Sequence, residues 1–492
     1  MIQDESEHIF RNHPSVIAGH ILTGAIALFV MFFAILSDQT KGYSVIEILA
    51  VIVLILVAVA VLSYFYWKRT FYIFEVNEIH VTRSAIWKMD KHIQYTRLAS
   101  VGVRRSIVDR IFGTSTLTFN VNSSMNATAA EATLVLKKDM ADRLRNQLNE
   151  LVFQKQNTVQ DDMEVDTLIH VSNGDVIIHA ILGQPTYQAL FGLAMLFYAV
   201  VMVFVDNSGG LITALILLVI SEVMPFVSVI LRYYNYRIYR VGDTVTVEGG
   251  LITTRRSSFK VNKINSVRMR EPLLARLFHR SMLEAEVVGM ADDDSRIPLL
   301  CPLKNRDDVR RVMFQLVPEF VFEAESEHQP RRALIPMVIT DTVFAVIVIG
   351  ICVALLFTAE TYLAGMSEMW TAVVRASEIL AAIVVPLIIY GHSGMAQKHR
   401  TFDMGEDSFL FVYGGYDICT EYINYDKVQS VAVTAGPLQR AFGVAKCEIR
   451  LMSSMGFKEI TSGLFEPDDL EMVGDTVMAR IRDGRYDYRK YY

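Results

Sequence analysis

Four ionisable residues lie within segments that are otherwise strongly apolar, and their side chains are well placed to do chemistry. They are Glu222, Asp341, Arg375 and Glu378. A charged group at the centre of a bilayer costs roughly 2.5–3.5 kcal/mol, so each should face another helix or an oppositely charged partner. One interpretation is a proton or ion path with Glu222 as the carrier. The preferred interpretation is pairing between helices, for instance Arg375 with Glu378, because the first apolar segments have no acidic residue at a matching depth.

A second set of residues consists of arginines in the polar regions that follow the first and second pairs of apolar segments. A basic side chain close to an anionic membrane surface gains about 1 kcal/mol. The residues predicted to contact anionic lipid in this way are Arg104, Arg105, Arg255, Arg256, Arg268 and Arg270. Three alternatives remain for these arginines. They could attract the domain to the bilayer by general electrostatics, form a specific headgroup pocket, or simply face the solvent.

Motifs for catalysis are missing from the sequence. It has no G-x-S-x-G, P-loop, H-E-x-x-H or dinucleotide fingerprint. Its four cysteines show no C-x-x-C or zinc-ligand spacing, and a net charge of −6 gives no support to a nucleic-acid partner. We therefore expect a protein that is not an enzyme, with no cofactor, no metal site and no nucleic-acid partner.

A sequence repeat indicates which elements must position these residues. The motif RLASVGVRRSIVDRIF begins at Arg97, and related copies begin at Lys263 and Lys427, which are 166 and then 164 residues further on. A period of this length indicates a triplicated unit. Each copy has a Ser-Val followed by Arg-x-Phe, and the shared positions are Ser100, Arg110, Phe112, Ser266, Arg276, Phe278, Ser430, Arg440 and Phe442.

Two roles are open for these motif residues. The three arginines could receive an anionic headgroup or a partner's carboxylate. Alternatively, the valines and phenylalanines are core residues, and each arginine caps a helix or covers apolar surface with its stem. Recurrence in all three copies favours the structural role.

Six apolar segments are long enough to span a bilayer, which takes about 20 helical residues. They fall into three hairpins at residues 15–66, 187–231 and 334–390, each followed by one motif copy in a polar domain, at residues 67–152, 232–319 and 398–483. The hairpin loops hold only Lys41, whereas the opposite helix ends are rich in Lys and Arg. By the positive-inside rule, both termini and all three polar domains should face the cytoplasm.

Each polar domain shows alternating apolar and polar residues followed by a helical pattern. In the first domain, Phe71, Ile73, Ile79 and Val81 suit one buried face of a sheet, and residues 140–152 have helical spacing. The predicted fold is a small bent antiparallel sheet with a C-terminal helix. Residues 153–186 and 320–333 are predicted linkers, in which an apolar run from Asp175 extends the next span or forms a short helix on the membrane surface.

The triple motif, each copy behind a hairpin, resembles the bacterial pleckstrin-homology-like (PH-like) domain as arranged in YdbT-type membrane proteins. The third copy departs from the pattern, with Ala432 and Thr434 where the first copy carries Gly102 and Arg104 and the second carries Arg268 and Arg270. The resemblance implies PH-like folds, a partner that is a smaller membrane protein with a single PH-like domain, and a role in tolerance of membrane-active bacteriocins or envelope stress.

The leading functional hypothesis is a non-enzymatic membrane assembly protein whose cytoplasmic PH-like platform docks on the lipid bilayer and on the smaller partner. The alternative is a proton-coupled transporter or exporter that uses Glu222, Asp341, Arg375 and Glu378. An enzyme of lipid or envelope chemistry is a third class, which the missing catalytic motifs disfavour.

Overall fold

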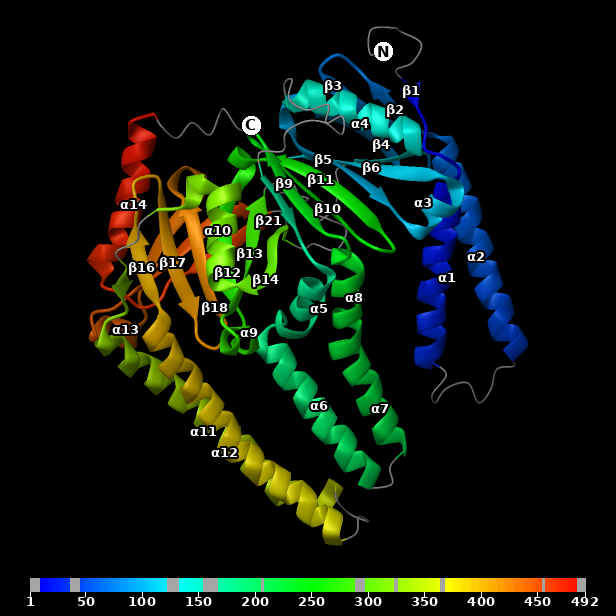
Figure 1. Cartoon of the computed structure of the whole chain (residues 1–492). Helices are drawn as coiled ribbons and strands as arrows, with labels where there is room; N and C mark the ends of the chain where they lie inside the picture. The colour runs from blue at the N-terminus through cyan, green and yellow to red at the C-terminus, as the bar shows by residue number, and fades with distance from the viewer. Residues whose placement is uncertain are drawn as a thin grey trace.

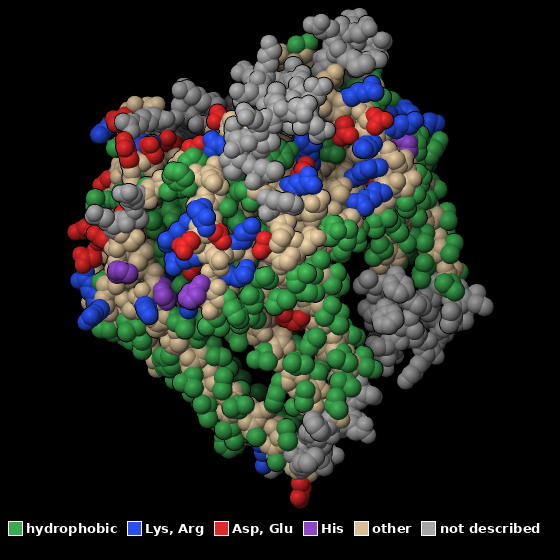
Figure 2. All heavy atoms as spheres, in the orientation of Figure 1, with side chains coloured by type: hydrophobic (Ala, Val, Ile, Leu, Met, Phe, Trp, Pro, Cys, Tyr) green, Lys and Arg blue, Asp and Glu red, His purple; other side chains and the backbone are tan. Residues whose placement is uncertain are grey.

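The computed structural model contains three similar units in chain order (Figure 1). It describes residues 9–35, 45–121, 132–153, 167–204, 208–287, 297–322, 326–362, 368–453 and 456–484. Hydrophobic side chains cover the long helices, and basic and acidic side chains gather over the sheets (Figure 2). The molecule is thus divided into an apolar helical side and a polar β side.

The long helices form three pairs. The first pair is α1 (Ser15–Ile35) with α2 (Val45–Lys68), and the third is α11 (Leu334–Tyr362) with α12 (Glu368–His399). In the second, α6 (Thr186–Phe204) packs on a helix that runs through α7 (Ser208–Leu218), the π-helical segment η2 (Val219–Val223) and α8 (Met224–Tyr233). Helices that are apolar on every side suit a lipid environment.

Five of these helical segments are long and apolar enough to cross a membrane. They are Leu49–Lys68, Thr186–Val203, Gly210–Tyr233, Arg331–Thr358 and Thr371–His399, while the described apolar stretch of α1, Ser15–Leu28, is shorter. Only 6–11 % of each span is buried inside the protein. The three pairs leave the β side as separate hairpins (Figure 1), and their low burial leaves their surfaces available to lipid.

Unit 1 surrounds the first helix pair. Its remaining elements are β1 (Ile9–Phe10), β2 (Thr70–Phe74), β3 (Glu78–Ser84), β4 (Lys88–Gln94), η1 (Tyr95–Arg97), β5 (Leu98–Arg105), α3 (Ile107–Phe112), β6 (Thr114–Val121), β7 (Ala132–Lys137) and α4 (Lys138–Phe153). The core of the unit joins strand residues such as Ile79, Val101 and Leu117 to Leu144 and Leu148 of α4.

Unit 2 repeats this order around the second pair. Its remaining elements are β8 (Thr167–His170), α5 (Asn173–Leu182), β9 (Arg237–Val241), β10 (Thr244–Gly249), β11 (Thr254–Lys260), η3 (Val261–Lys263), β12 (Ile264–Glu271), α9 (Leu273–Leu277), β13 (Arg280–Val287), β14 (Leu299–Asn305), α10 (Arg306–Leu316) and η4 (Pro318–Phe320).

Unit 3 follows the same plan around the third pair. Its remaining elements are β15 (Glu327–His328), η5 (Arg331–Ala333), β16 (Thr401–Met404), β17 (Ser408–Gly414), β18 (Ile418–Asn424), η6 (Tyr425–Lys427), β19 (Val428–Thr434), α13 (Pro437–Ala441), β20 (Lys446–Ser453), β21 (Gly456–Thr461) and α14 (Pro467–Arg482).

A short strand before each helix pair is a feature that the sequence did not reveal. β1, β8 and β15 pair with β2, β9 and β16, the strands that directly follow the helices. The segments predicted as linkers are therefore partly ordered. In the second of them, α5 begins at a capping box formed by Ser172 and Asp175, and Gly183 and Pro185 separate it from α6. It is thus not an extension of the spanning helix.

The sheets do not coincide with the units, which corrects the prediction of one small sheet in each domain. One seven-stranded sheet has the order β7-β6-β5-β11-β10-β9-β8, and another has the order β14-β13-β12-β18-β17-β16-β15. In each, three strands come from one unit and four from the next. The motif strand of one unit pairs with the third post-helix strand of its neighbour, as β5 with β11 and β12 with β18. We call these two contacts the first and second junctions.

Candidate functional site: a basic cleft at the first junction

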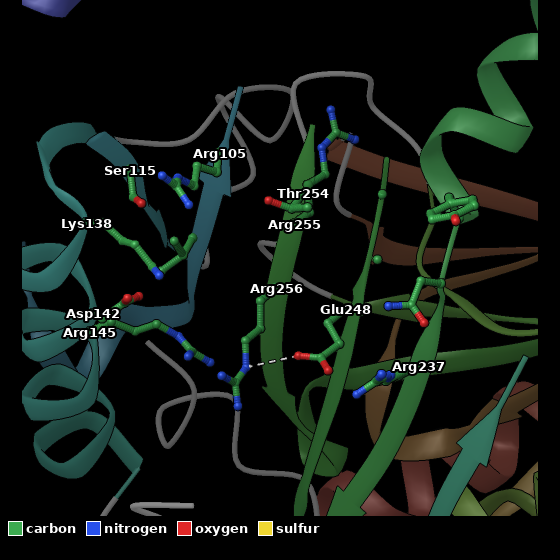
Figure 3. A pocket seen from close by; sticks show the side chains of 15 residues that line it. Arg105, Ser115, Lys138, Asp142, Arg145, Arg237, Glu248, Thr254, Arg255 and Arg256 are labelled. Atoms are coloured by element: carbon green, nitrogen blue, oxygen red, sulfur yellow. Dashed lines mark ion pairs between the residues drawn. The ribbon is translucent and has the colours of Figure 1, made fainter. Parts of the chain in front are cut away.

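A cleft of about 340 Å³ lies where units 1 and 2 meet. Six basic and two acidic residues line it, namely Arg105, Lys138, Arg145, Arg237, Arg255 and Arg256 with Asp142 and Glu248. Figure 3 shows Arg105, Lys138 and Arg145 of unit 1 on one side and Arg255, Arg256 and Arg237 of unit 2 on the other. The surplus of positive charge makes this a candidate anion site.

Arg145 is the most deeply buried of these cations. It is 6 % exposed, and its Nη2 donates a hydrogen bond to the Ser258 hydroxyl of unit 2 at 3.2 Å. Its Nε is buried with no hydrogen-bond partner among the described residues. Burial, with the neighbouring charge of Arg256, lowers the pKa of Arg145 to about 10, so the side chain stays charged at neutral pH. A buried charge with an unused donor favours the binding of an anion.

Neighbouring side chains hold the rest of the cleft in place. Arg256 Nη2 donates to the Tyr239 hydroxyl at 2.7 Å, and its Nε lies 3.5 Å from Glu248. Arg105 Nε donates to the carbonyl of Thr114 at 3.2 Å. Glu248 therefore neutralises part of the charge, and the cleft as a whole remains cationic.

The cleft lies at the base of a spanning helix. The amides of Gly250 and Leu251, which follow β10, donate to the carbonyls of Tyr234 and Leu231 at the end of α8, at 2.9 and 2.8 Å. Gly250 has φ +114°, and a Cβ there would lie 2.0 Å from the Thr253 carbonyl, so this turn requires glycine. The site is thus tied to the point where the helix leaves the apolar region.

The same relation holds in the other two units. Trp87, which follows β3, stacks on Tyr66 of α2 with ring centroids 6.1 Å apart. In unit 3, the Tyr416 hydroxyl donates to the carbonyl of Ile388 in α12 at 2.6 Å. In every unit, the loop between the second and third post-helix strands therefore contacts a spanning helix, which seats the β domain directly on the membrane side.

The predicted lipid contacts are only partly brought together. Arg105, Arg255 and Arg256 line the cleft, and Arg104 lies opposite Arg255 in the strand register. Arg268 instead contacts Glu284 at 2.8 Å, and Arg270 lies 3.6 Å from Asp417. The last two therefore stabilise the second junction, which does not fit the prediction of lipid contact for them.

Three residues of the cleft were missed by sequence reasoning, namely Lys138, Arg145 and Arg237. Arg145 lies between Leu144 and Leu148 of the predicted helix, and that spacing indicated only an amphipathic helix. Its burial depends on Ser258, which lies 113 residues away along the chain. No local signal could have identified it.

The motif serines and arginines occupy different environments in the three units. Ser100 lies in β5, although its side chain is outside the described residues, while Ser266 is fully buried against Glu421 and Ser430 is exposed. Arg110 and Arg440 are exposed, and Arg276 Nη2 lies 3.5 Å from the Met395 sulfur of α12. These positions do not form a common binding site.

The motif phenylalanines differ from the expectation of core residues. Phe112 and Phe278 are 48 % and 62 % exposed, and only Phe442 packs against a small core group with Ala333 and Leu464. These residues lie in or just after the short helices α3, α9 and α13, and α3 lies against α1. Exposed aromatic side chains beside spanning helices suit the membrane interface.

The four intramembrane residues are not assembled into one cluster. Glu222 lies in η2, and its carboxylate sits over Gly192 of α6, where a Cβ would lie 2.2 Å from it. Asp341 lies on the third pair, in a cavity with His392 and Arg400. Arg375 and Glu378 both lie in α12, one turn apart, and their pairing stays a prediction.

One group of side chains has the geometry of metal ligands. His80, Asp90 and His92 of unit 1 have ligand atoms within 4.8 Å of one another. His80 hydrogen-bonds Asp90, while His92 Nδ1 lies 2.8 Å from Glu78. These contacts explain the cluster without a metal, so it carries no functional assignment.

Comparison with known proteins agrees with this architecture. The family model described as Bacterial PH domain matches residues 22–152, 177–316 and 338–481, one match in each unit. The chain therefore belongs to the bacterial PH domain family, and it is a membrane protein that carries three such domains.

A particular relative supports the same conclusion. The chain is similar to the UPF0699 transmembrane protein YdbT of Bacillus subtilis (strain 168), with 19 % identity over 356 residues that make up 66 % of this chain and 71 % of the relative. The predicted resemblance to YdbT-type proteins is thus confirmed. No solved structure matches the chain significantly.

Proposed function

We propose that this protein is a non-enzymatic membrane scaffold whose PH-like platform binds the phosphate of an anionic lipid headgroup, one with net negative charge, in the basic cleft. In this proposal α1 completes a sixth span, and both termini and the β domains lie in the cytoplasm. The observation that carries the proposal is Arg145, a buried cation with an unused donor, in a cleft at the base of a spanning helix.

The chemistry of the cleft favours a headgroup over a solvated surface. Guanidinium groups bind phosphate through charge-assisted hydrogen bonds in defined geometry. Attachment to the spanning helices keeps the cleft close to the anionic leaflet, where a lipid phosphate is always present at high local concentration. Binding would also bridge units 1 and 2, since the lining residues come from both.

The test uses the full-length protein in mild detergent, with thermal unfolding followed as short-chain phosphatidylglycerol or phosphatidylcholine is added. Phosphatidylglycerol should raise the unfolding temperature, and Arg145→Met should weaken its apparent affinity about tenfold or more, because a charge-assisted hydrogen bond is lost. The control is Arg143→Met, which removes an exposed arginine from the same helix.

The outcomes distinguish a lipid headgroup from a free anion as the ligand of the cleft. Equal stabilisation by inorganic phosphate would assign the cleft to a free anion. No difference between the two lipids, or equal loss in both variants, would contradict the proposal.

A proton-coupled transporter is the second candidate, and Glu222 is the observation that favours it. A π-helical segment in a spanning helix is frequently a functional site. The Glu222 Oε1 atom is buried with no hydrogen-bond partner among the described residues, against Gly192. Glu222→Gln should abolish proton flux in reconstituted vesicles if this candidate is right, and should leave lipid binding unchanged if the scaffold proposal is right.

Two expectations from the resemblance remain predictions. They are a smaller partner with one PH-like domain, and tolerance of membrane-active bacteriocins or envelope stress. Purification of the intact protein from its host in mild detergent, followed by mass spectrometry, would test the partner. Bacteriocin survival of a deletion strain would test the role.

A further inference from the structure

The two junctions inside the chain are the same interface used twice. Residues of β5 correspond to β12 residues 166 positions later, and residues of β11 correspond to β18 residues 164 positions later. With these offsets the register is identical at all five shared positions. The matched pairs are Val101–Ser258 with Val267–Tyr422, Gly102–Ser257 with Arg268–Glu421, Val103–Arg256 with Met269–Thr420, Arg104–Arg255 with Arg270–Cys419, and Arg105–Thr254 with Glu271–Ile418.

Within the described residues, units 1 and 3 each have one strand of this interface without its partner strand. β4, the third post-helix strand of unit 1, is the edge of the sheet β1-β2-β3-β4. β19, the motif strand of unit 3, is the edge of the sheet β19-β20-β21. Within the described residues neither strand has a neighbour on its outer side. An edge strand with open backbone groups is a template for pairing with another chain.

β19 lacks most of the features that protect an edge strand, and its register irregularity between Val428 and Ser430 is shared with the paired strands β5 and β12. Its sequence, VQSVAVT, contains no charge and no proline, and Ser430, Ala432 and Thr434 are exposed. The equivalent strands β5 and β12 carry two and three charged residues and are covered by their junctions. The departure of the third motif copy from the other two therefore lies on a strand whose outer edge has no partner strand within the described residues.

We propose that β19 of one molecule pairs with β4 of a second copy of this chain, in the register of the two internal junctions. That register places Val431 opposite His92, Ala432 opposite Lys91 and Val433 opposite Asp90. The chain carries both halves of the interface, so the occupant is a second copy and the contact joins unit 3 of one molecule to unit 1 of the next. This inference does not depend on the lipid site.

The side chains across the new junction are complementary. At the second junction, Arg268 lies between Glu421 on one strand and Glu284 on the other. At the proposed junction, the small side chain of Ala432 lies between Lys91 and Glu448, a carboxylate that Lys446 also contacts at 2.7 Å. At the first junction the equivalent position is Gly102, and a Cβ there would lie 3.5 Å from the hydroxyl of Ser257 on the opposite strand. The residues at this position therefore differ between the three junctions, and in each junction they fit side by side.

The geometry keeps every helix pair on the same side. The two internal junctions place all three pairs below the sheets (Figure 1). In unit 1 the loop before β4 contacts the end of α2, as the loops before β11 and β18 contact α8 and α12. A third junction in the same register therefore keeps the helices of the second copy in the plane of the first. A head-to-tail contact of this kind generates a ring or a row of molecules.

Cysteine cross-linking in native membranes tests the register directly. Ala432→Cys and Lys91→Cys, introduced together in the full chain, should give a ladder of cross-linked copies on mild oxidation, because directly opposed residues are close enough to bridge. The matched control is Ala432→Cys with Asp90→Cys, since neighbouring strand residues point to opposite faces and this pair should cross-link far less.

Substitutions that change the charges at the same pair of positions give an independent test, in which self-association of the purified protein is measured. Ala432→Lys places a lysine opposite Lys91 and should weaken self-association about fivefold, and adding Lys91→Glu should restore it. Met478→Lys, at an exposed position of α14, is the control and should have no effect.

Cross-linking of both cysteine pairs to the same extent, or no cross-linking between copies, would overturn the proposal. Capture of a different protein by Ala432→Cys would overturn it as well, because β19 would then serve another partner. Failure of the Lys91→Glu rescue would show that the strands do not pair in this register.

Discussion

At the scale of single residues, His179 shows how burial makes the fold sensitive to pH. It lies in α5 at 8 % exposure, edge-on to Tyr233 with ring centroids 5.7 Å apart. Burial lowers the pKa of His179 from 6.5 to about 4, so the folded protein holds the ring neutral. The unfolded chain binds the proton more readily, and stability is therefore complete above pH 6.5 and falls as the pH drops towards 4.

The expected size of this effect is roughly 3 kcal/mol. His179→Phe should reduce the loss of stability below pH 6, because the replacement ring fills the site and cannot be protonated. Chemical unfolding at several pH values measures this, and His279→Asn, an exposed position, should retain the pH dependence of the original protein. Equal slopes for His179→Phe and the original protein would show that the buried histidine does not titrate as described.

At the scale of elements, Glu421 holds β18 against β12 at the second junction. It is fully buried, and it contacts Lys458 and accepts hydrogen bonds from Ser266 and from Tyr413, the latter at 2.9 Å. Burial alone would raise the pKa of Glu421, but Lys458 and Arg268 outweigh burial and lower it. The junction therefore contains an ionised carboxylate at neutral pH.

Removing this carboxylate takes one of two acidic neighbours from Lys458 and from Arg268, which keep Glu286 at 3.7 Å and Glu284 at 2.8 Å. Glu421→Ala should reduce stability by up to about 3–5 kcal/mol, the range expected when one member of a buried charged group is lost. Thermal unfolding of the purified protein measures the effect, and Glu471→Ala, at an exposed position of α14, should change little. A small effect of Glu421→Ala would mean that solvent enters the junction and stabilises the remaining charges.

At the scale of the whole molecule, the repeat period and the apolar segments predicted the three units, because both are properties of consecutive residues. The strand exchange between units was not predictable in the same way. Alternation in β5 or β11 indicates which face of the strand is buried, and it carries no information on which strand lies beside it.

The candidate site, like the sheets, was only partly predictable from the sequence. Arg105, Arg255 and Arg256 were identified as basic residues of polar domains attached to apolar segments, whereas Arg145 lay within a helical pattern. The cleft exists only where two units meet, and short-range patterns do not specify such contacts. The intramembrane pairing was predicted from the nearness of Arg375 and Glu378 along one helix, and it stays a prediction.

The shared register of the junctions also bears on how such a chain could have arisen. Every unit presents the same acceptor strand and the same donor strand, so duplication of the coding segment for one unit adds a module that already fits its neighbours. Loss of an internal unit likewise leaves two edges of matching type. The number of modules in a lineage can therefore change in single genetic steps, while each new module arrives with its own pair of long apolar helices and its own loop that contacts them.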